Sequence, residues 1–165
     1  MSLVRATALL ALVGFVSASW SAGEAAAPTQ PLAVVVNKSN PVSDLSFADL
    51  RAIFMGRRAK WPNGRRVTIA LLDPGQPERD AVLGQIYRMT EPEVTRLFLH
   101  ATFTGEQLAL PRSLANPAGV RRFVFNVPGA IGVVAQSDLD DTVKVVRIDG
   151  LALADSGYHL LLRRP

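Results

Sequence analysis

The chain has 165 residues, of which 48% are hydrophobic and 19% are charged. This length allows one compact domain, and the composition excludes disordered, collagen-like and coiled-coil chains. The absence of cysteine excludes disulfides, a thiolate nucleophile and cysteine-ligated metal centres, and only two histidines are available for a histidine-rich metal site.

The N-terminal segment has the order of a secretory signal peptide. Arg5 is followed by an uncharged run over residues 6–22, which begins with the apolar stretch ATALLALVGFV and continues with small residues. A membrane anchor is the alternative, but the apolar stretch is shorter than the roughly 20 residues needed to span hydrocarbon. We therefore predict a signal peptide over residues 1–27, with cleavage near 23–28 or after the small residues 17–19. The mature domain, residues 28–165, is then expected in the periplasm or outside the cell.

The positive charge belongs to the predicted mature domain. The whole chain has a formal net charge of +4 and a pI of about 10.1, and removal of residues 1–27 takes away one basic and one acidic residue. In a cytoplasmic protein this charge would indicate nucleic acid. Export instead favours a small anion, a glycan or a lipid surface as the partner, and we predict no nucleic-acid binding.

The first half of the mature chain alternates strand and helix signals. The apolar run 32–36 predicts a strand buried on both faces. Ser46 with Asp49 resembles a capping box, and the apolar residues that follow share one face of a short helix ending at Gly56. A polar loop then leads into a second apolar strand over 67–72.

The second half continues with helices and then strands. We predict a helix over 78–89, a helix from the capping pair Thr90 and Glu93 to Gly105, and a helix that Asn116 caps. Late strands are expected over 130–135, 143–148 and 158–162. This order indicates an α/β domain with a mixed, largely parallel sheet flanked by helices. Ligands of such sheets bind at the carboxyl ends of strands, here the loops that start at Asn37 and Asp73.

The loop Asp73–Asp80 joins a predicted strand to a predicted helix. Its amides and the positive helix end could hold an anion, with Arg79 as a fork-shaped donor. The alternative is an ordinary turn whose acidic residues complement the helix dipole. Pro74 and Pro77 also remove amide donors from the loop.

A basic cluster surrounds Trp61 and is the other candidate surface. Its members are Arg51, Arg57, Arg58, Lys60, Arg65 and Arg66. The cluster is either a patch for an anion or a partner, or a solvated loop whose cations complement a helix end.

Neither the aspartates nor the histidines form a recognisable catalytic or metal motif. Asp138, Asp140 and Asp141 lack the closing glutamate of a calcium loop, which favours a charged turn. His100 and His159 have no serine or cysteine nucleophile motif nearby. We predict no enzyme activity, no catalytic residues, no metal and no cofactor.

Three stretches resemble the phosphate ABC transporter substrate-binding proteins. They are NKSNPV at 37–42, IFMG at 53–56 followed by Trp61, and PGAIGVV at 128–134. The order and spacing of these motifs match those of the family over about residues 33–150. The resemblance implies a type 2 periplasmic-binding-protein fold in a short, single-lobe relative.

Two departures from that family bear on ligand binding. The family's phosphate loop reads R-x-x-G-S-G-T-R, and in the aligned residues 72–79 only Gly75 and Arg79 are retained. Glu78 replaces a hydroxyl, so its carboxylate would repel a phosphate oxygen. The mature chain also supplies one lobe, so a deep cleft would require a homodimer or another subunit.

Two hypotheses follow from the sequence. The first is an exported solute-binding protein for a small anionic ligand such as phosphate, with a membrane-bound transporter or sensor as partner. Its candidate ligand-binding residues are Gly75, Gln76, Glu78, Arg79 and Ser39. The second is an accessory or sensory protein-interaction domain without ligand, which uses the basic cluster and an exposed Trp61.

Overall fold

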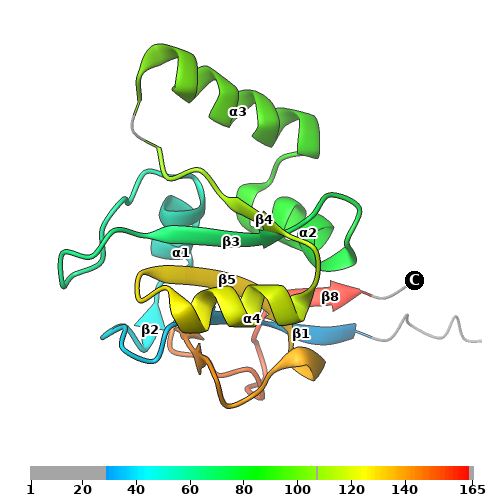
Figure 1. The fold of residues 1–165 in the computed structure, drawn as a ribbon. Helices are drawn as coiled ribbons and strands as arrows, with labels where there is room; N and C mark the ends of the chain where they lie inside the picture. The colour runs from blue at the N-terminus through cyan, green and yellow to red at the C-terminus, as the bar shows by residue number, and fades with distance from the viewer. Residues whose placement is uncertain (1–28, 107, 164–165) are drawn as a thin grey trace, which may run out of the picture.

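A mixed sheet with helices on both faces forms the centre of the molecule (Figure 1). This computed structural model describes residues 29–106 and 108–163. The predicted signal peptide lies outside the described residues.

The main sheet has the strand order β4-β3-β5-β1-β6, and β8 also pairs with β1. These strands are β1 (Thr29–Val36), β3 (Thr68–Leu72), β4 (Arg112–Leu114), β5 (Ala130–Ala135), β6 (Lys144–Val145) and β8 (Leu161–Arg163). β3 runs parallel to β4 and β5, whereas β1 runs antiparallel to β5, β6 and β8. A small second sheet pairs β2 (Asp44–Leu45) with β7 (Arg147–Ile148) in parallel. Because β1 and β3 run in opposite directions, their carboxyl ends lie at opposite ends of the sheet.

Three of the four α-helices in the described residues, α1, α3 and α4, begin at the capping residues that the sequence predicts. They are α1 (Phe47–Phe54), α2 (Pro77–Val82), α3 (Glu91–Thr104) and α4 (Pro117–Asn126), with a π-helical turn η1 (Leu83–Tyr87) and a 3₁₀ turn η2 (Gln136–Asp138). The Ser46 hydroxyl accepts from the Asp49 N–H at 3.0 Å, and the Asn116 side chain accepts from the Gly119 N–H at 2.8 Å. Thr90 and Glu93 form the predicted capping box.

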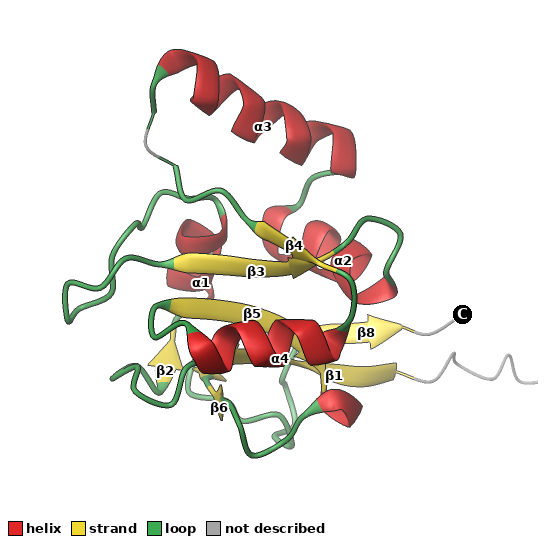
Figure 2. Cartoon of the chain, viewed as in Figure 1, coloured by secondary structure: helices red, strands yellow, loops and turns green. Residues whose placement is uncertain are grey.

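Alternate residues of β1 pack on the two faces of the sheet. Val34 and Val36 belong to the core beneath α1, α2 and η1, while Ala33 and Val35 pack with α4. In Figure 2, α4 lies across one face, with α1 and α2 on the other side of the strands. This two-sided burial explains the uninterrupted apolar run in the sequence.

Three predictions for helices and strands need adjustment. The helix expected over 78–89 is α2 followed by η1, and Arg88 ends it in a left-handed conformation. The strand expected over 143–148 is divided into β6 and β7, which pair with different strands, and the strand expected over 158–162 is reduced to β8. β2 and β4 were not predicted, because two or three residues are too short to show a period.

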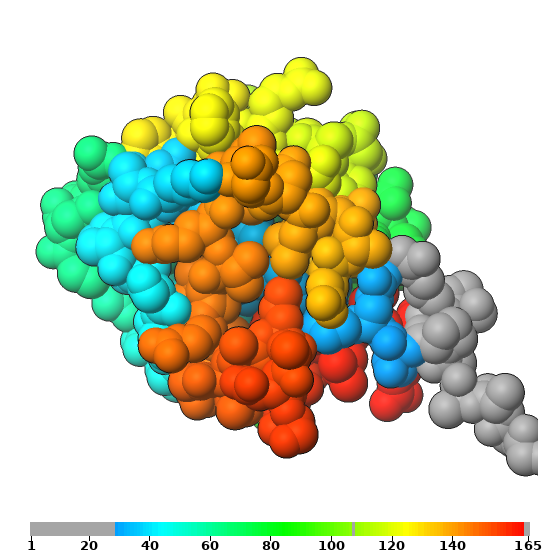
Figure 3. All heavy atoms as spheres, turned by 90° about the horizontal axis from the view of Figure 1, so that it is seen from below, coloured from blue at the N-terminus to red at the C-terminus, as the bar shows by residue number. Residues whose placement is uncertain are grey.

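Two further segments complete the described structure. The chain between β5 and β8, orange to red in Figure 3, covers the lower face next to the blue residues of β1. The helix α3 projects from the opposite side (Figure 1) and contacts the body through Phe98, whose ring lies 6.4 Å from that of Tyr87. Across residues 29–106 and 108–163, every helix is too short or too polar to cross a bilayer.

Candidate functional site

A tight turn joins β3 to α2. The Gln76 N–H donates to the Asp73 carbonyl at 3.3 Å, and Gly75 has φ +87°, a left-handed conformation that glycine adopts at low cost. Pro77 occupies the first turn of α2, where a missing N–H does no harm. The glycine and proline of the predicted turn therefore set how the chain enters α2.

The first turn of α2 has no side-chain cap. Gln76 is the N-cap residue, and its side chain makes no capping hydrogen bond. The first N–H groups of any helix lack an acceptor within the helix. The amides of Glu78 and Arg79 are therefore donors that α2 itself does not use.

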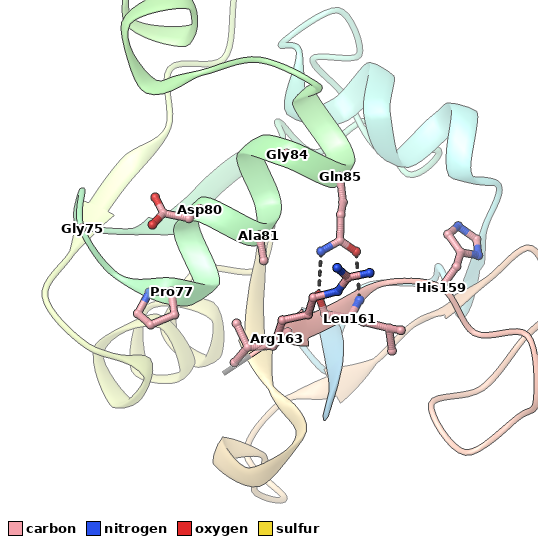
Figure 4. A pocket seen from close by; sticks show the side chains of 10 residues that line it. Gly75, Pro77, Asp80, Ala81, Gly84, Gln85, His159, Leu161 and Arg163 are labelled. Atoms are coloured by element: carbon pink, nitrogen blue, oxygen red, sulfur yellow. Dashed lines mark hydrogen bonds between the residues drawn. The ribbon is translucent and has the colours of Figure 1, made fainter. Parts of the chain in front are cut away.

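A cavity of about 640 Å³ lies between this turn, the helical segment α2–η1 and the C-terminal strand. Figure 4 shows it from close by, with the α2–η1 segment on one side and β8 on the other. The residues that line it are Gly75, Pro77, Asp80, Ala81, Gly84, Gln85, His159, Leu161, Leu162 and Arg163. Gln85 joins the two walls, because its side-chain amide donates to the Leu161 carbonyl at 2.6 Å and accepts from the Leu161 N–H at 2.9 Å.

The charges at the cavity come from both walls. Asp80 lies on α2, and His159 and Arg163 lie on the C-terminal segment. The imidazole of His159 stands edge to face against the ring of Phe47, with centroids 5.2 Å apart. The sequence reasoning did not assign His159, Gln85 or Arg163 to a site. In the structure, the residues from Tyr158 to Arg163 alternate between buried and more exposed positions, but the three consecutive leucines at 160–162 hide this alternation in the sequence.

Arg79 points into the protein and forms an ion pair with Glu91 of α3. Its Nε and Nη2 donate to the two Glu91 carboxylate oxygens at 2.7 and 2.6 Å, and Nη1 donates to the Leu72 carbonyl at 2.8 Å. The hydrogen bond with Glu91 raises the pKa of Arg79, and the same bond lowers the pKa of Glu91. The guanidinium thus fastens the start of α3 to the end of β3.

The structure does not bring the predicted ligand-binding residues to one place. Gly75 lines the cavity, whereas Gln76, Glu78 and Arg79 do not, and the side chains of Glu78 and Arg79 are buried. Ser39 follows β1 and therefore lies at the other end of the sheet. Its hydroxyl donates to Asn37 Oδ1 at 2.7 Å and accepts from Arg65 Nη1 at 3.2 Å. The assignment of these residues to a ligand stays a prediction.

The residues of the resemblance motifs make structural contacts at the end of the sheet where Ser39 lies. Asn37 Nδ2 donates to the carbonyls of Val124 and Phe125 at the end of α4, at 2.9 and 2.6 Å. Trp61 is 3% exposed, and its indole N–H donates to the Gly129 carbonyl at 2.9 Å. The expectation that Trp61 is an exposed contact residue is therefore wrong, since its apolar ring is part of the core.

The basic cluster around Trp61 is divided among several contacts. Arg58 forms an ion pair with Asp49 at 2.8 Å, and Arg65 reaches Ser39. Arg57 is exposed on the surface beyond α1. The cluster is thus a partly paired, solvated surface rather than one patch centred on an aromatic side chain.

The aspartates after β5 form a hydrogen-bonded turn. The Asp140 carboxylate accepts from Arg121 Nε at 2.7 Å and from the Thr142 N–H at 3.0 Å, and its pKa is lowered chiefly by the Thr142 hydroxyl. Across residues 29–106 and 108–163, no three histidine, aspartate or glutamate side chains are placed to hold a metal ion.

Comparison with known proteins identifies the fold. The sequence matches no protein-family model and no curated protein. The structure is similar to an ABC-type phosphate transport receptor from Vibrio cholerae, with a TM-score of 0.67 and 16% identity over 82% of this chain and 55% of that one. It is also similar to PstS from Borrelia burgdorferi, with a TM-score of 0.65 and 8% identity over 84% of this chain and 56% of that one. The chain has the fold of about half of a phosphate-binding protein.

A third similar structure, from Clostridium perfringens, contains bound phosphate. It has a TM-score of 0.66 and 19% identity over 82% of this chain and 54% of that one. At this level of identity the likeness concerns the fold, and it confirms the resemblance seen in the sequence motifs and the predicted α/β class with its mixed sheet flanked by helices. The chain spans about half the length of these neighbours, which are binding proteins rather than enzymes.

Proposed function

We propose that the chain is an exported solute-binding protein that takes a small oxyanion in the cavity between the α2–η1 segment and β8. The observation that carries the proposal is the cavity of about 640 Å³ between the α2–η1 segment and β8, with Arg163 in its wall, in a fold shared with phosphate-binding proteins. Pockets of a few hundred Å³ are the usual size of small-molecule sites. The cavity has room for phosphate or for a larger oxyanion.

The cation that this cavity offers to an anion is the side chain of Arg163, which lies near Gln85 in Figure 4, and Gly75 is the residue of the turn that lines the cavity. Gly75 lets the backbone approach a ligand because it has no side chain. Arg79 is already bound to Glu91 and the Leu72 carbonyl. In this proposal the arginine that binds the anion is therefore Arg163 and not Arg79, which the sequence indicated. Arg79 instead holds the end of β3 and the start of α3 together.

Export and delivery to a membrane-bound transporter are part of the same proposal. Export is supported by the basic, apolar and small-residue order of residues 5–22. The net charge of +4 favours the encounter with an anion.

Thermal unfolding of the mature domain tests the proposal. Phosphate and sulfate are compared with a neutral solute at matched ionic strength. A ligand that binds the folded state at about 100 times its Kd adds about 2.7 kcal/mol, which raises Tm by several degrees for a domain of this size. We expect a rise with an oxyanion and none with the neutral solute.

Two variants, each of which removes one positive charge, show where the anion binds. Arg163→Gln removes the cation at the cavity, and Arg122→Gln makes the same change on the exposed surface of α4. The rise in Tm should fall markedly in Arg163→Gln and persist in Arg122→Gln. If no anion raises Tm, or if both variants keep the full rise, the oxyanion site at α2 is wrong.

A further inference from the structure

Another hollow, of about 360 Å³, lies along α1 beside Arg88, the residue that follows η1. The two segments pack together, with the rings of Phe54 and Tyr87 6.0 Å apart. Phe47, Ala48, Ala52 and Met55 provide apolar surface in the hollow, and Arg51, Arg57 and Arg88 are its charged residues. The hollow shares no residue with the cavity beside α2, and a third hollow, which shares residues with both, lies between them.

The three arginines have no carboxylate partner within the described structure. Arg51 Nη2 reaches the Tyr87 carbonyl at 3.4 Å, a neutral acceptor. Of the nearby carboxylates, Asp49 pairs with Arg58, and Asp149, which lines an adjoining hollow with Phe47 and Arg88, accepts from the Phe47 N–H at 2.9 Å. Three cations around one hollow repel one another, and an anion would relieve that repulsion.

Arg88 is held in an uncommon backbone conformation. Its φ is +55° and it directly follows the π-helical turn η1. Left-handed backbone costs free energy for a residue with a side chain, and both this conformation and π turns are frequent at functional sites. Here the conformation ends η1 beside α1, where Arg88 lines the same hollow as Arg51 and Arg57.

We propose that this hollow binds an organic phosphate, with the phosphoryl group on the three arginines and the apolar part against Phe47 and Ala52. Guanidinium groups match phosphate oxygens in a two-pronged geometry. The concave shape and the apolar surface suit a molecule that has both a phosphoryl group and a hydrophobic part. An alternative explanation is that the arginines near the end of α1 interact with the free carbonyl groups of its last turn. That explanation would predict no ligand binding.

Calorimetric titration with phenyl phosphate tests the site, with phenol and inorganic phosphate as comparison ligands. Phenyl phosphate should bind more tightly than either, because only this molecule satisfies both parts of the hollow. Arg57→Gln removes an exposed cation, and Arg88→Asn removes a guanidinium while keeping a residue that tolerates left-handed backbone. Each variant should weaken binding by about tenfold or more.

Arg163→Gln separates this site from the proposed oxyanion site. It should leave phenyl phosphate binding unchanged if the ligand occupies the hollow between α1 and η1. If Arg163→Gln abolishes binding while Arg57→Gln and Arg88→Asn have no effect, the ligand occupies the cavity at α2 and the inference is wrong. The oxyanion proposal is judged separately, by the response of Tm to inorganic phosphate and sulfate.

Sedimentation with vesicles distinguishes a free phosphate ester from a lipid headgroup. Vesicles of phosphatidylcholine with and without phosphatidic acid are compared for the unaltered domain and for Arg57→Gln and Arg88→Asn. Binding that requires phosphatidic acid and is weakened in both variants assigns the phosphoryl group to a lipid. If neither phenyl phosphate nor phosphatidic acid binds, the inference fails.

Discussion

The two ends of the sheet differ in how their loops are held. At the end where β1 finishes, the side chains of Asn37 and Trp61 donate to backbone carbonyls on distant segments. At the end where β3 finishes, the turn before α2 contains an exposed glycine, the helix lacks a side-chain cap, and a cavity is present. The motifs that resemble the phosphate-binding family lie mostly at the first end. A motif match of this kind therefore predicts the fold better than it predicts the ligand.

The largest effect is expected from Gly129→Ala at the tightly packed end. A Cβ at Gly129 would lie 2.0 Å from the Arg66 carbonyl oxygen, so the backbone has to move. We expect a loss of about 3 kcal/mol in the free energy of unfolding, measured by urea denaturation.

Gly84→Ala is the matched control at the other end. A Cβ at Gly84 meets no atom within 4 Å, and the residue lies in the helical turn η1. Alanine should leave stability unchanged or raise it by up to about 1 kcal/mol. Equal losses in both variants would contradict the difference between the two ends.

Glu91→Gln tests whether the ion pair between Arg79 and Glu91 stabilises the fold. The pKa of Glu91 is lowered in the folded protein, so its contribution to stability is present above the pKa of the unfolded chain and is lost as pH falls through the folded pKa. We expect a loss of about 1–2 kcal/mol near neutral pH, since Arg79 is buried and Glu91 is partly exposed.

The pH dependence of this loss distinguishes the ion pair from simple packing. The difference in Tm between the unaltered protein and Glu91→Gln should shrink as the pH falls below about 4.3, the ordinary pKa of a glutamate. Glu106→Gln, which removes an exposed carboxylate on the loop after α3, is the control measured alongside it. A difference that is constant with pH would mean that Glu91 acts without its charge.

Trp61→Phe removes one hydrogen bond and keeps an aromatic ring in the core. The Gly129 carbonyl then loses the indole N–H that donates to it at 2.9 Å. We expect a loss of about 1 kcal/mol by urea denaturation, smaller than that of Gly129→Ala. A loss as large as that of Gly129→Ala would show that ring packing, rather than the hydrogen bond, holds this end.

Local signals in the sequence predicted most of the helices and long strands. The caps at Ser46, Thr90 and Asn116 are as expected, because capping depends on residues within one turn. The strand β5 has the predicted bounds, since its residues are all apolar. These elements were sufficient for the α/β class.

The candidate site could not be predicted in the same way, because it depends on contacts between distant residues. Arg79 pairs with Glu91 across the π turn, and no local pattern distinguishes this from an arginine that faces a ligand. The cavity wall comes from residues 159–163, which follow α2 by about 80 positions in the chain. The antiparallel direction of β1, which separates Ser39 from Gly75, also depends on pairing that the strand sequences do not specify.

The side chain of Gln85 covers part of the edge of strand β8. Its amide group occupies both backbone hydrogen-bonding groups of Leu161, as a neighbouring strand would. An exposed strand edge is a template for pairing with another chain, which is a route to aggregation. Gln85 therefore blocks strand addition at this point of β8, and the chain protects a vulnerable edge with one residue of a helical turn.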